Sequence, residues 1–320
     1  MLKACSISKH INKEAVRILR KNNISVDVWC GEKSPSKKEL KDLLRIYDIL
    51  IIGVKEKITK DMIEDIKRHK IIGTLSIGLD HIDKECIESN FIDVVNCPTA
   101  NVESVAEHIL ALILDLSKRI QEANDLVIDG KGDKKFLTSK PSDIRGKTIG
   151  LIGAGNISSK VVDIARIFQM SILCYTAHPN NHRDLTQKGV NFVELDELLQ
   201  NSDIVNVSVP LTEQTKNLIS REKVALLKEN AIFINTSRDE VTDVQALVEF
   251  ADRNSNFYLG LDIDTEQYSE LLSQRRNNII VTPHIAGCTD EAVQRTYIEC
   301  AENIVNIIEK IKAESKEERQ

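Results

Sequence analysis

Residues 147–158, Lys-Thr-Ile-Gly-Leu-Ile-Gly-Ala-Gly-Asn-Ile-Ser, constrain the fold of this chain more than any other stretch. An apolar run typical of a short buried strand ends at Ile152, and the apolar residues after Gly155 recur at helical spacing. A strand that turns into a helix in this way presents backbone N–H groups and the positive helix end to a pyrophosphate. A side chain at Gly153 or Gly155 would block that approach, and Ser158 replaces the third glycine of the usual pattern with another small residue. The stretch predicts dinucleotide binding; the alternative is a tight turn without a ligand.

The composition of the 320-residue chain is typical of a soluble globular protein, with 42% apolar and 29% charged residues. This length is enough for two domains. No apolar run approaches the roughly 20 residues of a membrane-spanning helix, and the N-terminus lacks a signal-peptide pattern, so we expect no membrane partner. A net charge of -6 argues against nucleic-acid binding. The seven scattered cysteines, without a C-x-x-C pair, predict reduced thiols in the cytoplasm and no metal site.

The first 98 residues alternate strand-like and helix-like segments, which predicts a small open α/β unit with a parallel sheet. Its strand-like runs are residues 2–7, 25–29, 49–52 and 71–75, and its helical patterns are residues 11–19 and 62–66. Pro98 breaks this alternation. A longer helical pattern then runs from about residue 102 to 127, long enough to cross between domains or to pair with a partner subunit.

A second α/β unit begins at Gly146, after a polar, lysine-rich loop at residues 129–143. The strands that we predict in it are residues 148–152, 171–175, 204–209, 231–235, 258–261 and 279–281. Helix-length segments separate them, and this regular alternation is typical of a doubly wound parallel sheet. A final helix at about residues 291–311 can return to the first unit.

Four stretches carry candidate functional groups at strand ends, where an open α/β sheet binds its ligands. The first, residues 76–83, is a glycine-containing turn whose N–H groups could hold a carboxylate; the alternative is a plain turn with Asp80 as a helix cap. The second, residues 235–238, places Arg238 at the end of an apolar strand. A guanidinium there can hold a 2-oxo carboxylate through two parallel hydrogen bonds, and the alternative is a surface arginine.

The third stretch, residues 260–267, carries acids that either orient a histidine or a nicotinamide amide, or merely solvate a loop. The fourth, residues 282–287, places His284 beside a proline that ends a strand. An imidazole is a candidate proton donor because its pKa lies near neutrality, although a lone histidine is more often structural. The other histidines have no comparable setting and are expected to be structural: His10, His69, His81, His108, His178 and His182.

Together, these stretches resemble the D-isomer-specific 2-hydroxyacid dehydrogenases, the family of the D-lactate, D-glycerate and D-3-phosphoglycerate dehydrogenases. The resemblance runs from about residue 45 to 305. Its most specific motifs occur in the family's order: Asn96-Cys-Pro98 with Asn101-Val-Glu-Ser-Val-Ala-Glu107, Pro210-Leu-Thr-Glu-Gln-Thr-Lys-Asn-Leu-Ile219, Asn235-Thr-Ser-Arg238 with Asp243 and Ala246-Leu247, and Thr282-Pro-His284-Ile-Ala-Gly287.

The resemblance implies an α/β fold of two doubly wound parallel-sheet domains. A dinucleotide-binding (Rossmann) domain at residues 99–289 would be inserted into a flavodoxin-like substrate domain formed by residues 1–98 plus 290–320. The family is usually dimeric through its dinucleotide domain, which implies a homodimer.

The implied reaction transfers a hydride between NAD(P)H and the C2 carbonyl of a small 2-oxo acid, which gives a D-2-hydroxy acid. Arg238 would bind the carboxylate, and protonated His284 would give its proton to the developing alkoxide. Further substrate contacts are implied for Ser76, Ile77, Gly78 and Asn101. Cofactor contacts are implied for Gly153, Gly155, Asn156, Ile157, Thr176, His178, Pro210, Thr236 and Asp262.

The chain departs from the family pattern near the catalytic acid and the arginine. The acid that pairs with the family's histidine belongs five residues after Asp262, where this chain has Gln267, with Glu266 one residue earlier. We favour Glu266 as the partner of the histidine; the alternative is that Gln267 orients it as a neutral group, without the charge that raises a histidine pKa. Asp239 and Glu240 follow the arginine where the family has glycine, and a negative charge there should weaken carboxylate binding unless it turns away.

A third departure concerns the choice of cofactor. NAD-using members carry an acid at the position of Thr176 that bonds the adenosine ribose. Without it a 2′-phosphate is no longer repelled, and His178, His182 and Arg183 could attract one. The cofactor is therefore NAD or NADP.

Two rival functions stay open on the same fold. One is a corepressor-like protein that senses the dinucleotide without turning it over; Arg238 and His284 favour the enzyme, whereas Asp239 and Gln267 favour this rival. The other is a specialised biosynthetic reductase acting on an unusual keto acid, which the altered loop after the arginine would suit.

Overall fold

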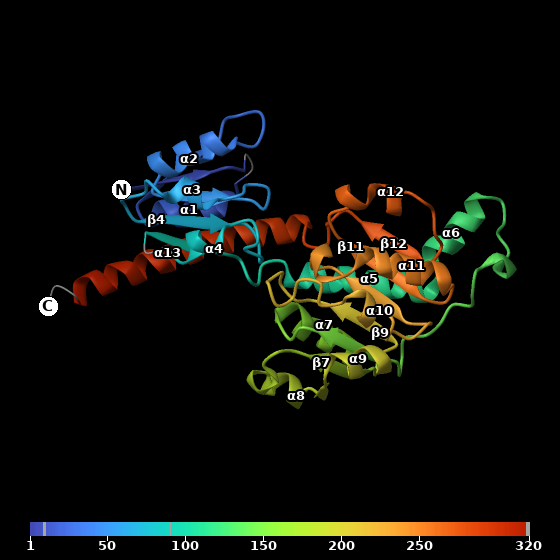
Figure 1. Ribbon diagram of the computed structural model, residues 1–320. Helices are drawn as coiled ribbons and strands as arrows, with labels where there is room; N and C mark the ends of the chain where they lie inside the picture. Colours follow the sequence, from blue (N-terminus) through green and yellow to red (C-terminus); the bar gives the residue numbers. More distant parts are fainter. Residues whose placement is uncertain (9–10, 90, 318–320) are drawn as a thin grey trace. The chain divides into compact units, whose positions relative to one another are not determined.

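The computed structural model describes residues 1–8, 11–89 and 91–317 and divides into two compact units (Figure 1). One unit comprises residues 1–101 and 290–320, and the other comprises residues 102–289. Over the described residues, the first unit has a five-stranded sheet and the second a seven-stranded sheet. All strand pairs in both sheets are parallel. The predicted fold class, two doubly wound parallel sheets with one inserted into the other, is confirmed.

The first unit has the strand order β2-β1-β3-β4-β5, which is the flavodoxin-like order. Its elements are β1 (Leu2–Ser6), α1 (Lys13–Lys21), β2 (Ile24–Val28), α2 (Lys37–Ile46), β3 (Ile49–Ile52), α3 (Lys60–Ile63), β4 (Lys70–Thr74), α4 (Lys84–Ile87), β5 (Ile92–Val95) and α13 (Asp290–Glu317). Helices α1 and α13 pack against each other on one face of the sheet, and α2, α3 and α4 supply the apolar side chains of the other face. The last helix therefore completes the unit in which the chain begins.

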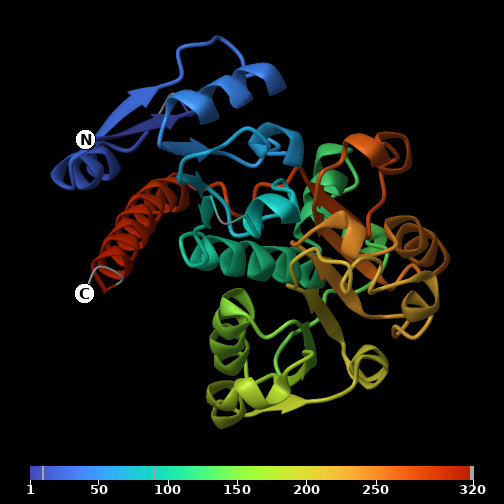
Figure 2. The ribbon, with the colours of Figure 1, turned by 60° about the vertical axis from the view of Figure 1, so that its left-hand side comes forward.

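The second unit has the strand order β12-β11-β10-β9-β6-β7-β8, so the direction of winding reverses between β6 and β9. Its elements are α5 (Val102–Lys118), α6 (Ile120–Ile128), η1 (Lys134–Phe136), β6 (Thr148–Ile152), α7 (Asn156–Ile167), β7 (Ser171–Tyr175), η2 (Pro179–Asn181), α8 (Arg183–Gln187), β8 (Val190–Phe192), α9 (Leu195–Asn201), β9 (Ile204–Val207), α10 (Arg221–Val224), β10 (Ile232–Asn235), η3 (Asp239–Val241), α11 (Val244–Arg253), β11 (Tyr258–Asp262), η4 (Glu266–Tyr268), α12 (Ser269–Leu272) and β12 (Ile279–Thr282). Helices α5 and α7 lie side by side over one face, and α9, α10 and α11 cover the other (Figures 1 and 2).

The predicted strands are all present, with ends that differ by at most two residues. Strands β5 and β8 are absent from the prediction; β8 has only three residues, of which Val190 alone is buried, so it carries no periodic signal. The final helix is confirmed and extends beyond the predicted bounds. Among the described residues, none of the helices combines the length and the apolar character that crossing a membrane would require.

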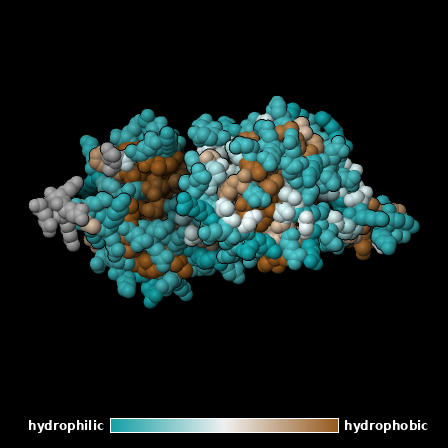
Figure 3. Space-filling view, turned by 90° about the horizontal axis from the view of Figure 1, so that it is seen from below, coloured by the Kyte–Doolittle hydropathy of each residue, from teal (hydrophilic) through white to brown (hydrophobic). Residues whose placement is uncertain are grey.

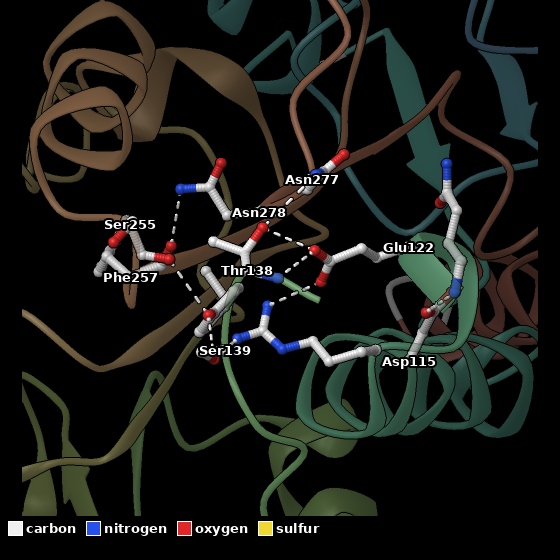
Figure 4. Close-up of polar contacts among 11 residues, drawn as sticks. Asp115, Glu122, Thr138, Ser139, Ser255, Phe257, Asn277 and Asn278 are labelled. Atoms are coloured by element: carbon white, nitrogen blue, oxygen red, sulfur yellow. Dashed lines mark hydrogen bonds and ion pairs between the residues drawn. The ribbon is translucent and has the colours of Figure 1, made fainter. Parts of the chain in front are cut away.

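The prediction of one helix from residue 102 to 127 is wrong, because the chain breaks at Arg119 into α5 and α6. Arg119 has a left-handed backbone with φ 62, which costs an L-residue about 1 kcal/mol or more. Its buried guanidinium lies 3.4 Å from the ring centre of Tyr258, donates to Ser139 Oγ, and approaches Glu122 Oε2 at 3.9 Å (Figure 4). Glu122 in turn accepts from the N–H and Oγ1 of Thr138. These contacts offset the backbone cost, and burial lowers the pKa of the Arg119 guanidinium to about 10.

Candidate active site

The carboxyl ends of the seven parallel strands meet at one edge of the second sheet, where an open α/β sheet binds its ligands. The candidate residues of this unit all follow strands at that edge. They lie after β6, β7, β9, β10, β11 and β12.

The turn after β6 has a backbone suited to a pyrophosphate. Gly153 has φ +105, and a Cβ there would lie 2.5 Å from the carbonyl oxygen of Ser208, so this position requires glycine. Gly155 precedes the twelve-residue helix α7, and a Cβ there would meet nothing within 4 Å. The open space beside Gly155 is where a phosphate could approach the first N–H groups of α7, at Asn156 and Ile157. The residues present therefore fit a dinucleotide.

Ser158 is fully buried on α7, and its Oγ has no hydrogen-bond partner among the described residues. The small side chain thus allows the close packing expected where the family pattern has its third glycine. Ser158, at the third position of the glycine pattern, is therefore constrained by helix–strand packing rather than by ligand binding.

The end of β7 carries the groups that bear on the choice of cofactor. Thr176 is half-buried, and its Oγ1 accepts from the backbone N–H of His178 at 3.5 Å. His178 and Arg183 are exposed, whereas the ring of His182 stacks on Phe192 with centroids 6.3 Å apart. The side chains nearest to this strand end in sequence are therefore neutral or basic.

Two further residues of the predicted cofactor site have few contacts of their own. Pro210, exposed beyond β9, accepts a hydrogen bond at its carbonyl oxygen from Thr215 Oγ1 at 2.5 Å. Thr236 is half-buried directly after β10. Both positions lie at the carboxyl edge of the sheet, and their contact with the cofactor stays a prediction.

The loop that carries Arg238 is shaped by Asn235, the last residue of β10, whose side chain is fully buried. Its Oδ1 accepts from the N–H and Oγ of Ser237 at 2.9 and 2.8 Å, and its Nδ2 donates to the carbonyl oxygen of Arg238 at 2.9 Å. The guanidinium of Arg238, half-buried, donates to the carbonyl oxygen of Ser237 at 3.0 Å. The loop geometry therefore comes from a buried amide that the sequence analysis had not singled out as a functional group.

The two residues that depart most from the family pattern contact each other. Asp239 is only 4% exposed, and its Oδ2 accepts a hydrogen bond from Gln267 Nε2 on η4. The hydroxyl of Tyr268 also bonds Asp239; burial and the nearby negative charge raise the pKa of Tyr268 to about 12. The Asp239 carboxylate is thus turned toward η4. Glu266, the preferred partner of the histidine in the sequence analysis, is exposed, and its N–H donates to Asp264 Oδ1 at 3.2 Å.

The turn that carries His284 is held by Asp262, the fully buried last residue of β11. Asp262 Oδ1 accepts from the N–H of Ile285, and Oδ2 accepts from the N–H of Ala286, both at 2.8 Å. His284 itself has a left-handed backbone with φ 54 and an exposed side chain. Asp262, for which the sequence predicts a cofactor contact, therefore fixes the turn that carries the histidine.

The same carboxylate is linked to helix α5. Thr282 Oγ1 donates to Asp262 Oδ1 at 2.6 Å and lies 3.1 Å from His108 Nε2. His108 Nε2 is 3.9 Å from Asp262 Oδ1. Sequence reasoning treated His108 as an isolated histidine, because the strand end that it contacts is 174 residues away along the chain.

The candidate substrate turn of the first unit is also built by side chains. Ser76 is buried; its Oγ donates to the carbonyl oxygen of Gly78 at 2.7 Å and lies 2.8 Å from Thr74 Oγ1. Thr74 Oγ1 is in turn 2.8 Å from Nε2 of the buried His81. His81, taken as unremarkable from the sequence, therefore belongs to the chain of hydrogen bonds behind this turn.

Asn96 and Asn101 are two further polar residues at or near this turn of the first unit. Asn96 Nδ2 donates to the carbonyl oxygen of Ile77 at 2.7 Å, so the turn is held from both sides. Asn101 Oδ1 is buried and has no hydrogen-bond partner within the described part of the chain. An acceptor in that state needs a donor, and a bound ligand can supply one.

The structure therefore brings together, at one edge of the second unit, the loops of Arg238, Asp239, Gln267 and His284. They follow the neighbouring strands β10, β11 and β12. The predicted residues 76–78 and 101 belong to the first unit and form a hydrogen-bonded turn and a buried acceptor there.

Comparisons with known proteins agree on one family. The family model for the NAD binding domain of D-isomer specific 2-hydroxyacid dehydrogenases matches residues 110–286. A hydroxypyruvate reductase from Thermotoga maritima is 35% identical over 303 residues, which cover 93% of this chain and 96% of that protein.

Two solved structures are similar over nearly the whole chain. An acyclic imino acid reductase in complex with NADPH and D-Arg has a TM-score of 0.86 and 30% identity, over 97% of this chain and 98% of that one. A D-lactate dehydrogenase from Aquifex aeolicus, complexed with NAD and lactic acid, has a TM-score of 0.78 and 29% identity, over 98% of this chain and 96% of that one.

Proposed function

We propose a specific reaction for this chain, which belongs to the D-isomer specific 2-hydroxyacid dehydrogenase family and is an NAD(P)-dependent oxidoreductase. It reduces the C2 carbonyl of a small 2-oxo acid to the D-2-hydroxy acid, or runs the reverse. The observation that supports this most is the placement of Arg238 and His284. They follow β10 and β12, the two strands that flank β11, at the same edge of one sheet.

In this proposal, the chain's own residues bind the substrate and move one proton. The guanidinium of Arg238 holds the carboxylate through paired hydrogen bonds. The imidazole of His284 gives a proton to the oxygen that becomes the hydroxyl, and NAD(P)H supplies the hydride. The N–H groups of residues 76–78 and the side chain of Asn101 hold the substrate as well. Arg238 and His284 matter most in the transition state, when negative charge develops on the oxygen.

We further assign residues 99–289 as the dinucleotide domain and residues 1–98 plus 290–320 as the substrate domain. The open space at Gly155 and the N-terminus of α7 support a pyrophosphate site. Asp262, Thr236 and Pro210 are further cofactor contacts in this assignment.

The test of the proposed function uses the purified full chain, NADH and NADPH, and a panel of 2-oxo acids. We expect loss of the reduced cofactor's absorbance with at least one acid, and a D-2-hydroxy acid as the product on chiral chromatography. Tight cofactor binding without turnover of any acid would instead favour a protein that senses the dinucleotide.

A second candidate reaction is the reduction of a 2-imino acid to a D-amino acid. The structural similarity favours it, because the TM-score is 0.86 with the imino acid reductase and 0.78 with the lactate dehydrogenase. Both substrates offer the same carboxylate to Arg238, but a protonated imine already carries the proton that a ketone must receive. Adding ammonium to the panel separates the two, because the product becomes a D-amino acid only if the imine is reduced.

The neutral side chain at Thr176 leads to a prediction about cofactor choice. Thr176→Asp should weaken NADPH binding about 100-fold and leave NADH binding nearly unchanged, because a carboxylate beside a 2′-phosphate costs several kcal/mol. Fluorescence titration of each cofactor measures the effect. Ser171→Asp, at the exposed opposite end of the same strand β7, is the control for added charge. Equal weakening by both substitutions would mean that Thr176 does not face the ribose.

We also propose a homodimer through the second unit. Helix α6 exposes Ile120, Val127 and Ile128 by 57%, 64% and 74%, an apolar surface that a second copy could cover. Apolar side chains also gather in patches on the face drawn in Figure 3. The mass of the particle in solution tests the proposal, since a monomer at micromolar concentration would contradict it.

A further inference from the structure

A small polar cavity lies in the second unit, at the amino edge of its sheet. Its wall includes the end of α5, the first turns of α6 and the residues that begin β12. Arg238 and His284 follow the carboxyl ends of their strands, so the cavity lies at the opposite edge. Its volume is about 30 Å³ for the centres of water-sized atoms, whereas one bound water needs roughly 10–15 Å³ on this measure. The cavity therefore has room for an occupant larger than a single water.

Two buried charged side chains on the cavity wall each have one atom without a hydrogen bond. Arg119 and Glu122 are both 4% exposed. Within the described part of the chain, Arg119 Nη1 and Glu122 Oε2 have no hydrogen-bond partner. These two atoms lie 3.9 Å apart, which is beyond hydrogen-bond distance (Figure 4). A buried charged atom without a partner is costly, so the pair indicates an occupant that bonds to both atoms.

The other charged groups on the wall have partners of their own. Asp115 accepts from a backbone N–H of α6 at 2.9 Å. Arg275 contacts Asp125 at 2.9 Å, and Arg276 contacts Asp252 at 2.7 Å. The donor and the acceptor that a ligand would satisfy are therefore those of Arg119 and Glu122.

The charges on the wall indicate the chemical class of the ligand. Among the described residues, three arginines and three acids line the cavity: Arg119, Arg275, Arg276, Asp115, Glu122 and Asp125. Burial lowers the pKa of the Arg119 guanidinium to about 10, so this group keeps its charge at neutral pH. A wall with balanced charges and one positive donor beside one negative acceptor is complementary to a zwitterion rather than to a free anion or a free cation.

An α-amino acid carries its two charges in the required arrangement. Its carboxylate and its ammonium group are attached to the same carbon atom, so they lie closer together than the 3.9 Å between Nη1 and Oε2. The carboxylate can accept from Arg119 while the ammonium group donates to Glu122, each at about 2.7–2.9 Å. Glu122 Oε1 already accepts from the N–H and Oγ1 of Thr138, which leaves Oε2 for the ligand.

We propose that this cavity is a binding site for a small α-amino acid, whose carboxylate bonds to Arg119 and whose ammonium group bonds to Glu122. The site is separate from the proposed active site, and the inference does not depend on the proposed reaction.

The surface of the proposed dimer lies on another face of α6. At 3.6 residues per turn, Ile120 and Val127 lie on one face of this helix, and Glu122 and Asp125 lie on the opposite face. A second copy that covers the exposed apolar side chains therefore does not have to cover the cavity.

The test is isothermal titration of the purified full-length protein with glycine, the smallest α-amino acid. We expect saturable binding of one glycine per chain. Acetate and methylammonium each lack one of the two charged groups of glycine. Each should bind at least about tenfold more weakly than glycine, because a hydrogen bond between charged groups is lost.

A substitution in the cavity wall locates the bound glycine. Glu122→Gln should weaken glycine binding at least about tenfold, because the amide keeps an acceptor for Thr138 but has no charge for the ammonium group. Asp129→Asn is the matched control, since it removes an exposed carboxylate at the end of the same helix and should leave the affinity unchanged. Arg238→Lys, at the opposite edge of the sheet, should also leave it unchanged. Thermal unfolding shows whether each variant retains the fold.

Each outcome decides for or against the site. Absence of saturable glycine binding would overturn the proposal and leave ordered water as the occupant. Equal binding of acetate and glycine would indicate an anion site instead. Binding that Arg238→Lys abolishes and Glu122→Gln retains would place glycine in the proposed active site and overturn the proposal as well.

Two further points keep the test decisive. If Glu122→Gln fails to fold, the comparison of glycine with acetate and methylammonium on the wild-type protein decides. A wild-type protein that binds glycine in the cavity but reduces no 2-oxo acid would contradict the proposed function and support this site.

Discussion

His284→Asn should abolish reduction while leaving cofactor affinity nearly unchanged. A neutral amide cannot release a proton to the developing alkoxide, and the loss of a general acid lowers kcat about 10²- to 10⁴-fold. Asparagine is the suitable replacement because His284 has a left-handed backbone, with φ 54, which asparagine tolerates better than most residues. The bonds from Asp262 go to the N–H groups of Ile285 and Ala286, so the turn itself should persist.

Single-turnover kinetics and a fluorescence titration of the cofactor measure the two halves of this prediction. Reduction requires the protonated imidazole, so the wild-type rate should fall as the pH rises through the His284 pKa, and the variant should lose this dependence. His69→Asn is the matched control; that side chain is partly exposed and contacts Asp93 at 3.0 Å in the first unit. Unchanged turnover in His284→Asn would remove His284 from the mechanism.

Arg238→Lys should lower kcat/KM about 10²- to 10³-fold, by the loss of transition-state stabilisation that one well-placed donor provides. A lysine keeps the charge but loses the planar fork that binds a carboxylate through two parallel hydrogen bonds. The loop should keep its shape, because Asn235 holds it through the backbone carbonyl of residue 238 and through Ser237. The change in kcat/KM therefore measures the role of the Arg238 side chain rather than a change in the fold.

Steady-state kinetics over a range of substrate concentrations show which state Arg238 stabilises. A lower kcat indicates contacts that strengthen in the transition state, whereas a higher KM with unchanged kcat indicates uniform binding of substrate and transition state. Arg221→Lys is the control, since that exposed arginine pairs with Glu249 at 2.7 Å on the surface of the same unit. Equal kinetics for the wild-type protein and Arg238→Lys would show that Arg238 does not contact the substrate.

The parts of the fold that could be predicted from the sequence are those with a local signal. Strands such as β6, β7 and β10 are short apolar runs bounded by turn residues, and each was found within one residue of its predicted ends. The glycine turn after β6 was recognisable because strand, turn and helix follow one another directly along the chain. The parallel, doubly wound class follows from the alternation of these segments.

The errors arose where a long-range contact outweighs the local pattern. The helical periodicity continues through Arg119, but the contacts of its guanidinium with Tyr258 and Ser139 stabilise a left-handed backbone there. Strand β8 is too short for periodicity to reveal, and it is defined by its pairing with β7. Local propensity is a weak preference that tertiary contacts routinely override.

The candidate site shows the same division between local and long-range information. Arg238 and His284 were found because each directly follows a strand, in a motif of a few residues. The roles of Asn235 and Asp262, as side chains that hold these two loops, depend on hydrogen bonds that no motif describes. The sequence predicted the chemical groups of the site but not the side chains that hold them.

By itself, the sequence determined the class of each unit and the glycine turn between a strand and a helix, and it predicted the roles of Arg238 and His284. Only the tertiary structure decided that the buried carboxylate of Asp239 turns toward Gln267, so that two separate departures from the family pattern form one contact. Along the chain, a strand, a helix and 28 positions separate these residues. Their contact exists because β10 and β11 pair in parallel and deliver both loops to the same edge of the sheet, an order that local periodicity does not encode.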